Sequence, residues 1–241
     1  DTIAKTFNNV PLITNFPYLE NFESGNGYWV SNGVNSSWQY GTPAGTVINS
    51  ASSGTKAWVT NLSGYYNNNE NSWVESPCFD FSALTNPHIS LRRLVHAENS
   101  YDGAAVQVSI DGGNVWYHVG NMNDPVNWYN DNTISGLAFC GSQEGWTGTT
   151  NATWQTSSHH VIPLAGYNYV KFRIVFGSDG SVNSYEGFAF DDFKIYEPVD
   201  VAIVYPIDST TTNICGLTNN ENVSVWIKNM TSNPIPAGEQ M

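Results

Sequence analysis

Apolar and polar side chains alternate along the chain wherever a regular pattern is visible. Apolar residues share one parity in residues 88–97, in residues 106–110 and in residues 170–176. A period of two residues is typical of strands that are buried on one face. Clusters rich in Asn and Gly separate these segments and favour turns. The pattern predicts an all-β protein, built as a two-sheet antiparallel sandwich and without a helix of ten residues.

A domain boundary is predicted near Pro198. Beyond it, residues 199–207 and 222–228 predict two further strands. The 43 residues that follow position 198 are too few for an immunoglobulin-like sandwich, which needs about 100 residues. We therefore expect residues 1–198 to form one domain and residues 199–241 to be the first part of a second, truncated β module. The alternative is that this tail packs on the first domain as extra strands.

Composition and charge narrow the classes of function. The chain of 241 residues carries 8 Lys+Arg against 21 Asp+Glu, a net charge of −13. Nucleic-acid binding by phosphate neutralisation is excluded, because no basic surface is available to displace counterions. The same balance disfavours anionic membranes, and no apolar run approaches the length of a membrane span. Abundant carboxylates favour divalent cations, and scarce Lys with abundant Asn, Ser, Thr and Trp favours a secreted or surface protein.

Residues 109–116 fit the pattern S-x-D-x-G-x-x-W, which is known as the Asp-box. It predicts a hairpin in which Gly112 and Gly113 adopt positive φ, Asp111 caps turn amides and Trp116 covers the turn. Sialidases repeat this pattern and add an arginine cluster, whereas this chain has one copy and three arginines. We therefore expect the box to be structural.

Two adjacent carboxylates, Asp191 and Asp192, lie in a predicted aromatic strand, and Glu23 follows an apolar run near the start of the chain. Carboxylates in such a strand are costly to bury unless a cation compensates for them. Because Lys and Arg are scarce, we predict a metal ion with oxygen ligands here. Asp191 shares its parity with Phe193 and is expected to point inward, and Asp192 outward. The alternative is that both carboxylates cap turns or accept backbone hydrogen bonds.

A second candidate metal site consists of residues in three other acidic turns. These residues are Asp102, Asp179 and Glu186. Their carboxylates are the hard oxygen donors that calcium prefers, but nothing in their spacing shows that the three turns meet.

Aromatic residues in loops are candidates for contact with a ligand. The apolar C–H face of a sugar ring stacks on a flat aromatic ring. Trp128, Tyr129 and Trp146 lie in segments rich in Asn, Gly and Thr and are the predicted ligand-binding residues. The alternative is that they pack these loops on the sandwich. Five further tryptophans occupy positions typical of strands and are expected in the core, namely Trp29, Trp38, Trp58, Trp73 and Trp116.

Motifs of enzyme active sites are absent from the sequence. We find no E-x-D-x-E strand of jelly-roll glucanases, no G-x-S-x-G, no H-E-x-x-H and no phosphate-binding glycine loop. We therefore expect no catalytic residue and no enzymatic activity. The chain has three cysteines, Cys78, Cys140 and Cys215, and whether Cys78 and Cys140 form a disulfide is left open.

Several short motifs follow one another in an order and spacing that are fairly specific, although each motif is weak alone. They are F-E-S-G at 22–25 with Trp29, S-W-Q-Y-G-T-P at 37–43, S-G-T-K-A-W at 53–58, E-S-P at 75–77, F-D-F-S at 79–82, D-G-A at 102–104, the Asp-box, G-W-T-G at 145–148 and residues 187–193. Through them, residues 15–197 resemble the MAM-like, concanavalin-type jelly-roll modules of secreted cell-surface proteins of the Bacteroidetes type.

This resemblance has implications for metal binding. In related β-sandwich carbohydrate-binding modules, a structural calcium ion ties the first strand to the last. The resemblance implies that the side chains of Glu23 and Asp191 hold Ca²⁺ here, with the carbonyl oxygens of Asn21 and Lys56 as further ligands. Such an ion would stabilise the sandwich and take no part in catalysis.

The tail resembles the start of bacterial Ig-like modules of the CARDB type, which follow such domains. The resemblance rests on V-D-V-A at 199–202, C-G-L at 215–217, E-N-V at 221–223 and I-P-A-G at 235–238. Further domains of the same polypeptide are therefore expected. Proteins that carry such modules are commonly exported by type IX secretion.

Together these features predict a non-catalytic, calcium-stabilised binding or adhesion domain of a larger extracellular cell-surface protein. Its expected partners are a polysaccharide or another surface protein, with no nucleic acid and no membrane insertion. Two alternatives stay open. One is an accessory domain of a secreted protease or glycosidase, and the other is a spacer without a ligand in a long adhesin.

Overall fold

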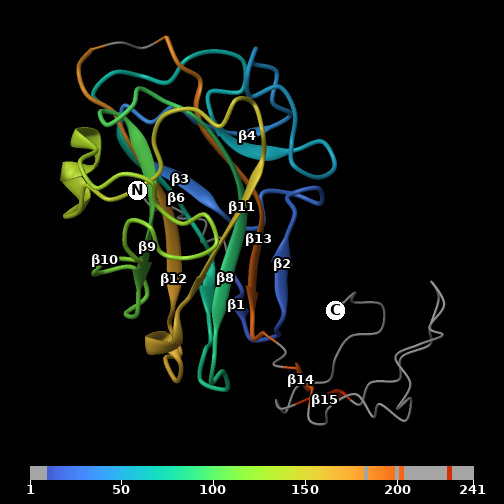
Figure 1. Ribbon diagram of the computed structural model, residues 1–241. Coiled ribbons are helices and arrows are strands. Elements are labelled where there is room, and N and C mark those ends of the chain that lie inside the picture. Colours follow the sequence, from blue (N-terminus) through green and yellow to red (C-terminus); the bar gives the residue numbers. More distant parts are fainter. Residues whose placement is uncertain (1–9, 182–183, 199–200, 204–226, 230–241) are drawn as a thin grey trace, which may run out of the picture. The chain divides into compact units, whose positions relative to one another are not determined.

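The computed structural model describes residues 10–181, 184–198, 201–203 and 227–229. The chain divides into two compact units, residues 1–197 and residues 198–241. This division lies one residue from the predicted boundary, and each unit is described by itself. The first unit is a sandwich of two mainly antiparallel sheets (Figure 1), so the all-β prediction is confirmed.

The first sheet consists, in spatial order, of the antiparallel strands β10 (Tyr117–His118), β9 (Gly103–Ser109), β12 (Lys171–Gly177), β6 (Asn71–Glu75) and β3 (Val30–Val34). At its centre, β9 and β12 pair from Ser109 opposite Lys171 to Gly103 opposite Gly177. β10 and β3 form its edges. β10 is short because it follows the Asp-box turn directly.

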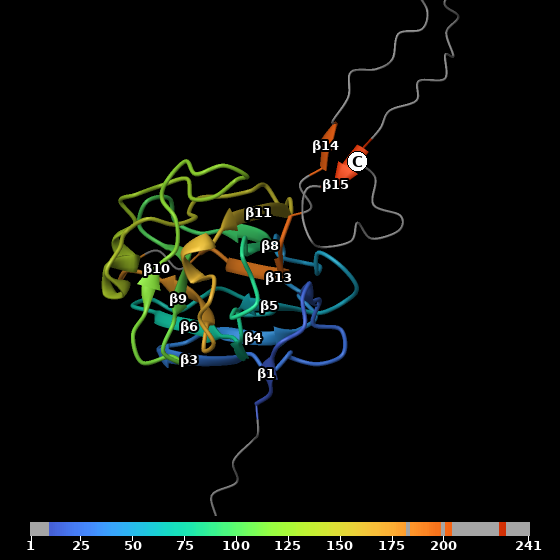
Figure 2. The ribbon, with the colours of Figure 1, turned by 90° about the horizontal axis from the view of Figure 1, so that it is seen from below.

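The second sheet consists of β11 (Gln155–His160), β8 (His88–His96), β13 (Gly187–Tyr196), β5 (Ala57–Thr60) and β4 (Trp38–Gly41), with β2 (Tyr18–Glu20) paired to β13. β11 is therefore an edge strand. A separate parallel pair consists of β1 (Leu12–Ile13) and β7 (Cys78–Phe79). Figure 2 shows β11, β8 and β13 in one layer and β10, β9, β6 and β3 in the other.

Apolar side chains from the inner faces of both sheets fill the space between them. Phe172, Ile174 and Phe176 of β12 are completely buried, as the alternation predicts. Aromatic rings contribute most of the larger side chains, and the ring centroids of Trp29 and Phe193 lie 4.9 Å apart. Removing this apolar surface from water is the main term that stabilises the sandwich.

The helical segments of the described residues are two short 3-10 turns, η1 (Ser135–Cys140) and η2 (Ile162–Leu164). η1 lies over the outer face of the first sheet, where Gln107 Nε2 donates to the Cys140 carbonyl at 2.7 Å. All of β9 is buried as a result, including its polar positions. In the part of the chain that is described, neither helical turn has the length and hydropathy of a membrane span.

The tryptophans expected in the core divide into two groups. Three of them are buried, namely Trp29, Trp38 and Trp58. Trp73 is partly buried and packs against the core. For Trp116 the expectation is wrong, because it is only partly buried outside the core, and both rings flank Arg173. The Arg173 guanidinium lies 4.6 Å from the Trp73 ring and 4.3 Å from the Trp116 ring, so each ring meets a cation on one face.

The Asp-box forms the predicted hairpin turn. Asp111 Oδ1 accepts the amides of Asn114 and Val115 at 2.9 and 3.0 Å, and Trp116 Nε1 donates to the Gly113 carbonyl at 3.0 Å. Gly112 and Gly113 have φ of 77° and 108°, values that side chains with a Cβ rarely adopt. These contacts account for Asp111, Gly112, Gly113 and Trp116 of the box without a ligand.

In the second unit, the structure describes β14 (Val201–Ile203), which pairs antiparallel with β15 (Ile227–Asn229). These strands overlap the predicted segments 199–207 and 222–228. The remaining motifs of the Ig-like resemblance lie outside the described residues, at 215–217, 221–223 and 235–238. The Ig-like, CARDB-type assignment therefore stays a prediction.

Candidate functional site

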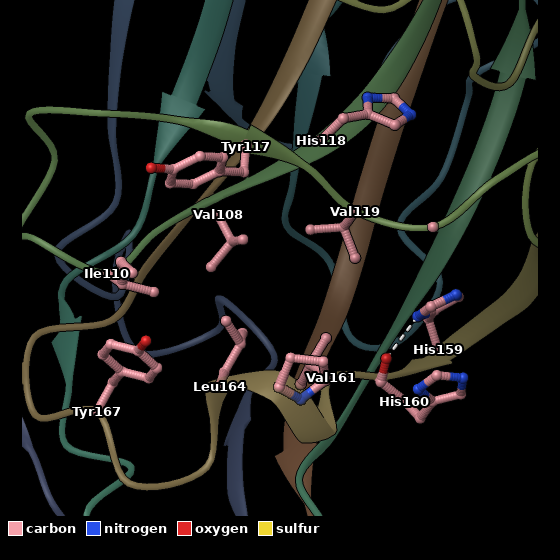
Figure 3. Close-up of a pocket in the computed structure, with 12 residues that line it drawn as sticks. Val108, Ile110, Tyr117, His118, Val119, His159, His160, Val161, Leu164 and Tyr167 are labelled. Carbon is pink, nitrogen blue, oxygen red and sulfur yellow. Dashed lines mark hydrogen bonds between the residues drawn. The ribbon is translucent and has the colours of Figure 1, made fainter.

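A groove of about 410 Å³ lies where the edge strands β10 and β11 leave the sandwich open (Figure 3). Apolar side chains of β9, of the positions that follow β9, β10 and β11, and of η2 line its inner part, and all but Ile110 are buried. These side chains are Val108, Ile110, Val119, Val161 and Leu164. The volume falls in the range of pockets that bind small ligands, about 300–1,000 Å³.

Polar and aromatic side chains surround this apolar surface. Tyr117 of β10 and Tyr167, which follows η2, are 53% and 43% exposed, and both lie on one side in Figure 3. His159 and His160 of β11 lie on the other side. His159 Nε2 is 2.9 Å from Asp124 Oδ2, which fixes the orientation of this ring. The groove thus combines two exposed aromatic rings with groups that can form hydrogen bonds.

His118 also lines the groove and keeps unused hydrogen-bonding capacity. Both ring nitrogens are buried and have no partner among the described residues. Its ring centroid lies 5.0 Å from that of Tyr129. Burial lowers the pKa of His118, so the neutral ring, with one donor and one acceptor, is favoured.

The aromatic residues predicted to bind a ligand lie behind this groove, in the core. Trp128, Tyr129 and Trp146 are 2%, 1% and 0% exposed. Each ring uses its polar atom inside the protein: Tyr129 Oη accepts the Val106 amide at 2.8 Å, and Trp128 Nε1 donates to the Val119 carbonyl at 3.0 Å. The prediction of ligand contact is wrong, because these rings pack loops on the sandwich. Sequence reasoning missed Tyr117 and Tyr167, although Tyr167 lies in a Gly-Tyr-Asn-Tyr turn signal.

The loop between β4 and β5, residues 42–56, is held on the outer face of the second sheet by carboxylates. Glu186 accepts three consecutive amides, those of Thr46 at 2.7 Å, Val47 at 2.9 Å and Ile48 at 2.6 Å. Glu186 therefore does not join Asp102 and Asp179, and this part of the second predicted metal site is wrong. Its charge is met by amides of the β4–β5 loop, which lie 138 to 140 positions earlier in the chain.

Asp191 is completely buried but does not face the core. A bulge lies between Asp191 and Lys194, and Asp192 has a φ of 49°. The bulge reverses the alternation, so the prediction that Asp191 shares the inward face of Phe193 is wrong. Asp191 Oδ2 accepts the amides of Ser52 and Ser53 of the β4–β5 loop at 2.9 and 3.0 Å. Burial raises the pKa of Asp191 to about 6.

Asp192 and Glu23 bind the same loop. Asp192 Oδ1 accepts the Ser53 hydroxyl at 2.7 Å. Glu23 Oε1 accepts the amides of Thr55 and Lys56 at 2.8 and 2.7 Å, which lowers the pKa of Glu23. The backbone hydrogen bonds that we gave as the alternative to a metal ion are therefore present.

The calcium ion that the resemblance implies would have to bind the carboxylate lone pairs that these hydrogen bonds leave free. Glu23 Oε2 and Asp191 Oδ1 each accept a single hydrogen bond, from the Thr55 hydroxyl and the Asp192 amide. One lone pair is left on each oxygen. The Lys56 ammonium donates to the Glu23 carbonyl at 3.3 Å, and Asn21 Oδ1 accepts the Glu23 amide at 3.3 Å. The carboxylates fit an ion only through these remaining lone pairs.

Asp102 and Asp179 do lie together, with Glu98 as the third carboxylate. One oxygen from each residue lies within 4.8 Å of the other two. Sequence reasoning missed Glu98, and the signal was its position four residues before Asp102 in the same turn. Among the residues that the structure describes, no other group of three His, Cys, Asp or Glu side chains comes together in this way.

Cys78 and Cys140 are free thiols. Cys140 Sγ donates to the Leu137 carbonyl at 3.0 Å. Burial raises the pKa of both thiols, so neither is activated as a thiolate. The open question of a disulfide between them is answered by two separate thiols, and Cys215 lies outside the described residues.

No profile of a known protein family matches the chain. A segment of 124 residues, 52% of the chain, is 30% identical to Bacillopeptidase F of Bacillus subtilis (strain 168). The chain spans only 9% of the length of this curated relative.

The chain is similar to solved structures that include adhesin, carbohydrate-binding and glycoside hydrolase domains. The K1 cleaved adhesin domain of Lys-gingipain from Porphyromonas gingivalis W83 is 14% identical, with a TM-score of 0.43 over 76% of this chain and 99% of that chain. The C-terminal CBM6 of a laminarinase from Zobellia galactanivorans is 17% identical, with a TM-score of 0.40 over 75% and 98%. The CBM22-1 xylan-binding domain of Paenibacillus barcinonensis Xyn10C is 11% identical, with a TM-score of 0.40 over 77% and 96%.

Proposed function

We propose that this protein is a non-catalytic binding domain of an extracellular cell-surface protein, and that it binds a polysaccharide in the groove between β10 and β11. The observation that carries the proposal is the pair of exposed tyrosines, Tyr117 and Tyr167, beside an apolar surface. Sugar rings present apolar C–H faces that stack on such rings, and their hydroxyls need hydrogen-bond partners. The exposed imidazole of His160 supplies such a partner on the same groove.

The groove favours an uncharged sugar over an acidic one. No Lys or Arg lines it, and the chain carries a net charge of −13. An acidic polysaccharide would therefore meet no Lys or Arg side chain in the groove.

Substitution of the two tyrosines tests this proposal. A panel of soluble neutral polysaccharides is screened first by affinity electrophoresis, and the strongest binder is then titrated. Tyr117→Ala and Tyr167→Ala should each weaken binding three- to tenfold, about 0.7–1.4 kcal/mol, which is the usual value of an aromatic contact. Tyr169→Ala is the matched control, because Tyr169 is 54% exposed but does not line the groove. Equal loss in all three variants, or retention on no polysaccharide, contradicts the proposal, and the second outcome favours a spacer.

Calcium stabilisation is also part of this proposal. The resemblance places the ion at Glu23 and Asp191, and the lone pairs that remain on Glu23 Oε2 and Asp191 Oδ1 support it. Chelation should then lower the melting temperature, and Asp191→Asn should remove this sensitivity while the fold is retained. A wild-type melting temperature that is the same with and without chelator argues against the ion.

The second candidate function is an accessory domain of a secreted protease. The similarity to part of Bacillopeptidase F favours it. The MAM-like assignment and type IX export likewise stay predictions. Sequencing the complete gene separates this candidate from an adhesin, because a protease catalytic motif elsewhere in the same polypeptide would support it.

A further inference from the structure

Three carboxylates from two loops meet at the ends of neighbouring strands. Asp102 directly precedes β9, and Asp179 follows β12. The two strands pair with Gly103 opposite Gly177, so the segments next to them converge. The Asp179 amide donates to Asp102 Oδ1 at 2.8 Å. Glu98, in the loop between β8 and β9, completes the group.

The separation of these carboxylates suits a single cation. One oxygen of each lies within 4.8 Å of the other two. Oxygens bound to one Ca²⁺ at about 2.3–2.6 Å lie at most about 5 Å from one another. The three oxygens are therefore close enough to bind the same ion, without movement of the backbone.

Among the described residues no basic side chain forms an ion pair with these three carboxylates, although Asp179 Oδ1 accepts the amide and the hydroxyl of Ser181. Glu98 Oε2 is buried and accepts no hydrogen bond from any described residue. Asp102 is completely buried, and its other partner is the neutral Tyr66 hydroxyl. The two ion pairs of the described residues involve Asp124 and Glu75 instead. A buried oxygen without a donor is costly, so this one indicates a missing partner of positive charge.

We propose that Glu98, Asp102 and Asp179 bind a divalent cation, Ca²⁺, which ties the β8–β9 loop to the segment after β12. All three donors are oxygens, which favours calcium over zinc or copper. Ca²⁺ accepts irregular coordination more readily than Mg²⁺ does, and water would supply its remaining ligands. This site is separate from Glu23 and Asp191, and it does not depend on the glycan proposal.

Calcium titration of the full chain tests the proposal. Protein stripped with EDTA is titrated with CaCl₂ by isothermal calorimetry, with circular dichroism as the measure of folding. Glu98→Gln should lose one bound Ca²⁺ per chain or bind it at least tenfold more weakly. Asp80→Asn is the matched control and should titrate as the wild type does, because Asp80 caps the nearby Ser82 amide in an exposed turn.

Asp191→Asn separates the two calcium proposals. If only Asp191→Asn loses an ion, or if wild type and Glu98→Gln bind Ca²⁺ equally, including no binding in either, the present inference is overturned. Asp179→Asn replaces Glu98→Gln if the latter does not fold. Crystals of the wild type grown with TbCl₃ give an independent measurement. Anomalous density beside Glu98 Oε2 supports the site, and its absence there overturns it.

Discussion

Glu186 and Asp102 are both buried carboxylates that directly precede a strand, but the groups around them differ. Glu186 accepts three amides of the β4–β5 loop. Asp102 accepts two hydrogen bonds and faces Asp179 and Glu98, the second of which has an unpaired oxygen. A carboxylate surrounded by amides holds a loop without help, whereas one surrounded by carboxylates needs a cation. The comparison shows that acidic composition alone does not locate a metal site.

The largest effect is expected at Glu186. Glu186→Ala removes the acceptor of three amides, of which that of Ile48 is buried, and should lower the free energy of unfolding by about 3 kcal/mol. Denaturant unfolding measures this value. Glu186→Gln keeps one oxygen and should lose about half as much. A loss below about 1 kcal/mol for the alanine variant would show that the loop is held by its apolar contacts instead.

In the absence of calcium, substitution of Glu98 should stabilise the protein, whereas substitution of Glu186 destabilises it. Without calcium, Glu98→Gln removes one of three like charges and should raise the free energy of unfolding by about 0.5–1 kcal/mol. With calcium in excess, the same variant should be less stable than the wild type, because it loses the ion that binds the folded state. Thermal unfolding in EDTA and in CaCl₂ measures both. If Glu98→Gln changed the free energy of unfolding in the same direction in both buffers, the proposed difference between the surroundings of Glu98 and those of Glu186 would be contradicted.

The pH dependence of stability distinguishes the regions further. The pKa values of Asp102 and Asp191 are raised to about 6 in the folded state, above the ordinary value of an aspartate. The folded state then binds protons more tightly than the unfolded state, so stability contributed by these groups increases as the pH falls through 6. Unfolding in EDTA between pH 7 and 5 should show this increase. Asp191→Asn should reduce the slope, and an unchanged slope would contradict the burial of its charge.

The smallest effect is expected at Glu23. Its carboxylate is partly exposed, so water can replace it as the acceptor for the amides of Thr55 and Lys56. In EDTA, Glu23→Gln should shift the melting temperature by little more than the error of the measurement. In CaCl₂ the same variant should be less stable than the wild type, because the proposed function assigns a calcium ion to Glu23, and an equal melting temperature in CaCl₂ would contradict that ion.

The sandwich was predictable because its signals are local. Alternation in residues 170–176 marks β12, and the Asp-box marks the turn before β10 through its own glycines and carboxylate. Each of these patterns depends on neighbours within a few positions. Because these patterns do not depend on contacts with distant parts of the chain, they are sufficient to predict the fold class.

The candidate sites were less predictable because they depend on contacts across the chain. The bulge at Asp192 reverses the face of Asp191, and nothing in the sequence announces it. Glu186 binds amides 138 to 140 positions away, whereas Glu98 meets Asp179 only because β9 pairs with β12. The groove arises from the relative position of two sheet edges. Periodicity within a segment carries no information on such pairings.

Arg173 lies between Trp73 and Trp116 on the outer surface of the first sheet and covers one face of each ring. Gln107 Oε1 accepts two hydrogen bonds from this guanidinium, at 2.8 and 2.6 Å, and thereby fixes it. The indole surfaces that it covers are closed to a flat partner unless the arginine moves away. An uncovered ring face is found instead at the margin of this sheet, where Tyr117 of the edge strand β10 is 53% exposed.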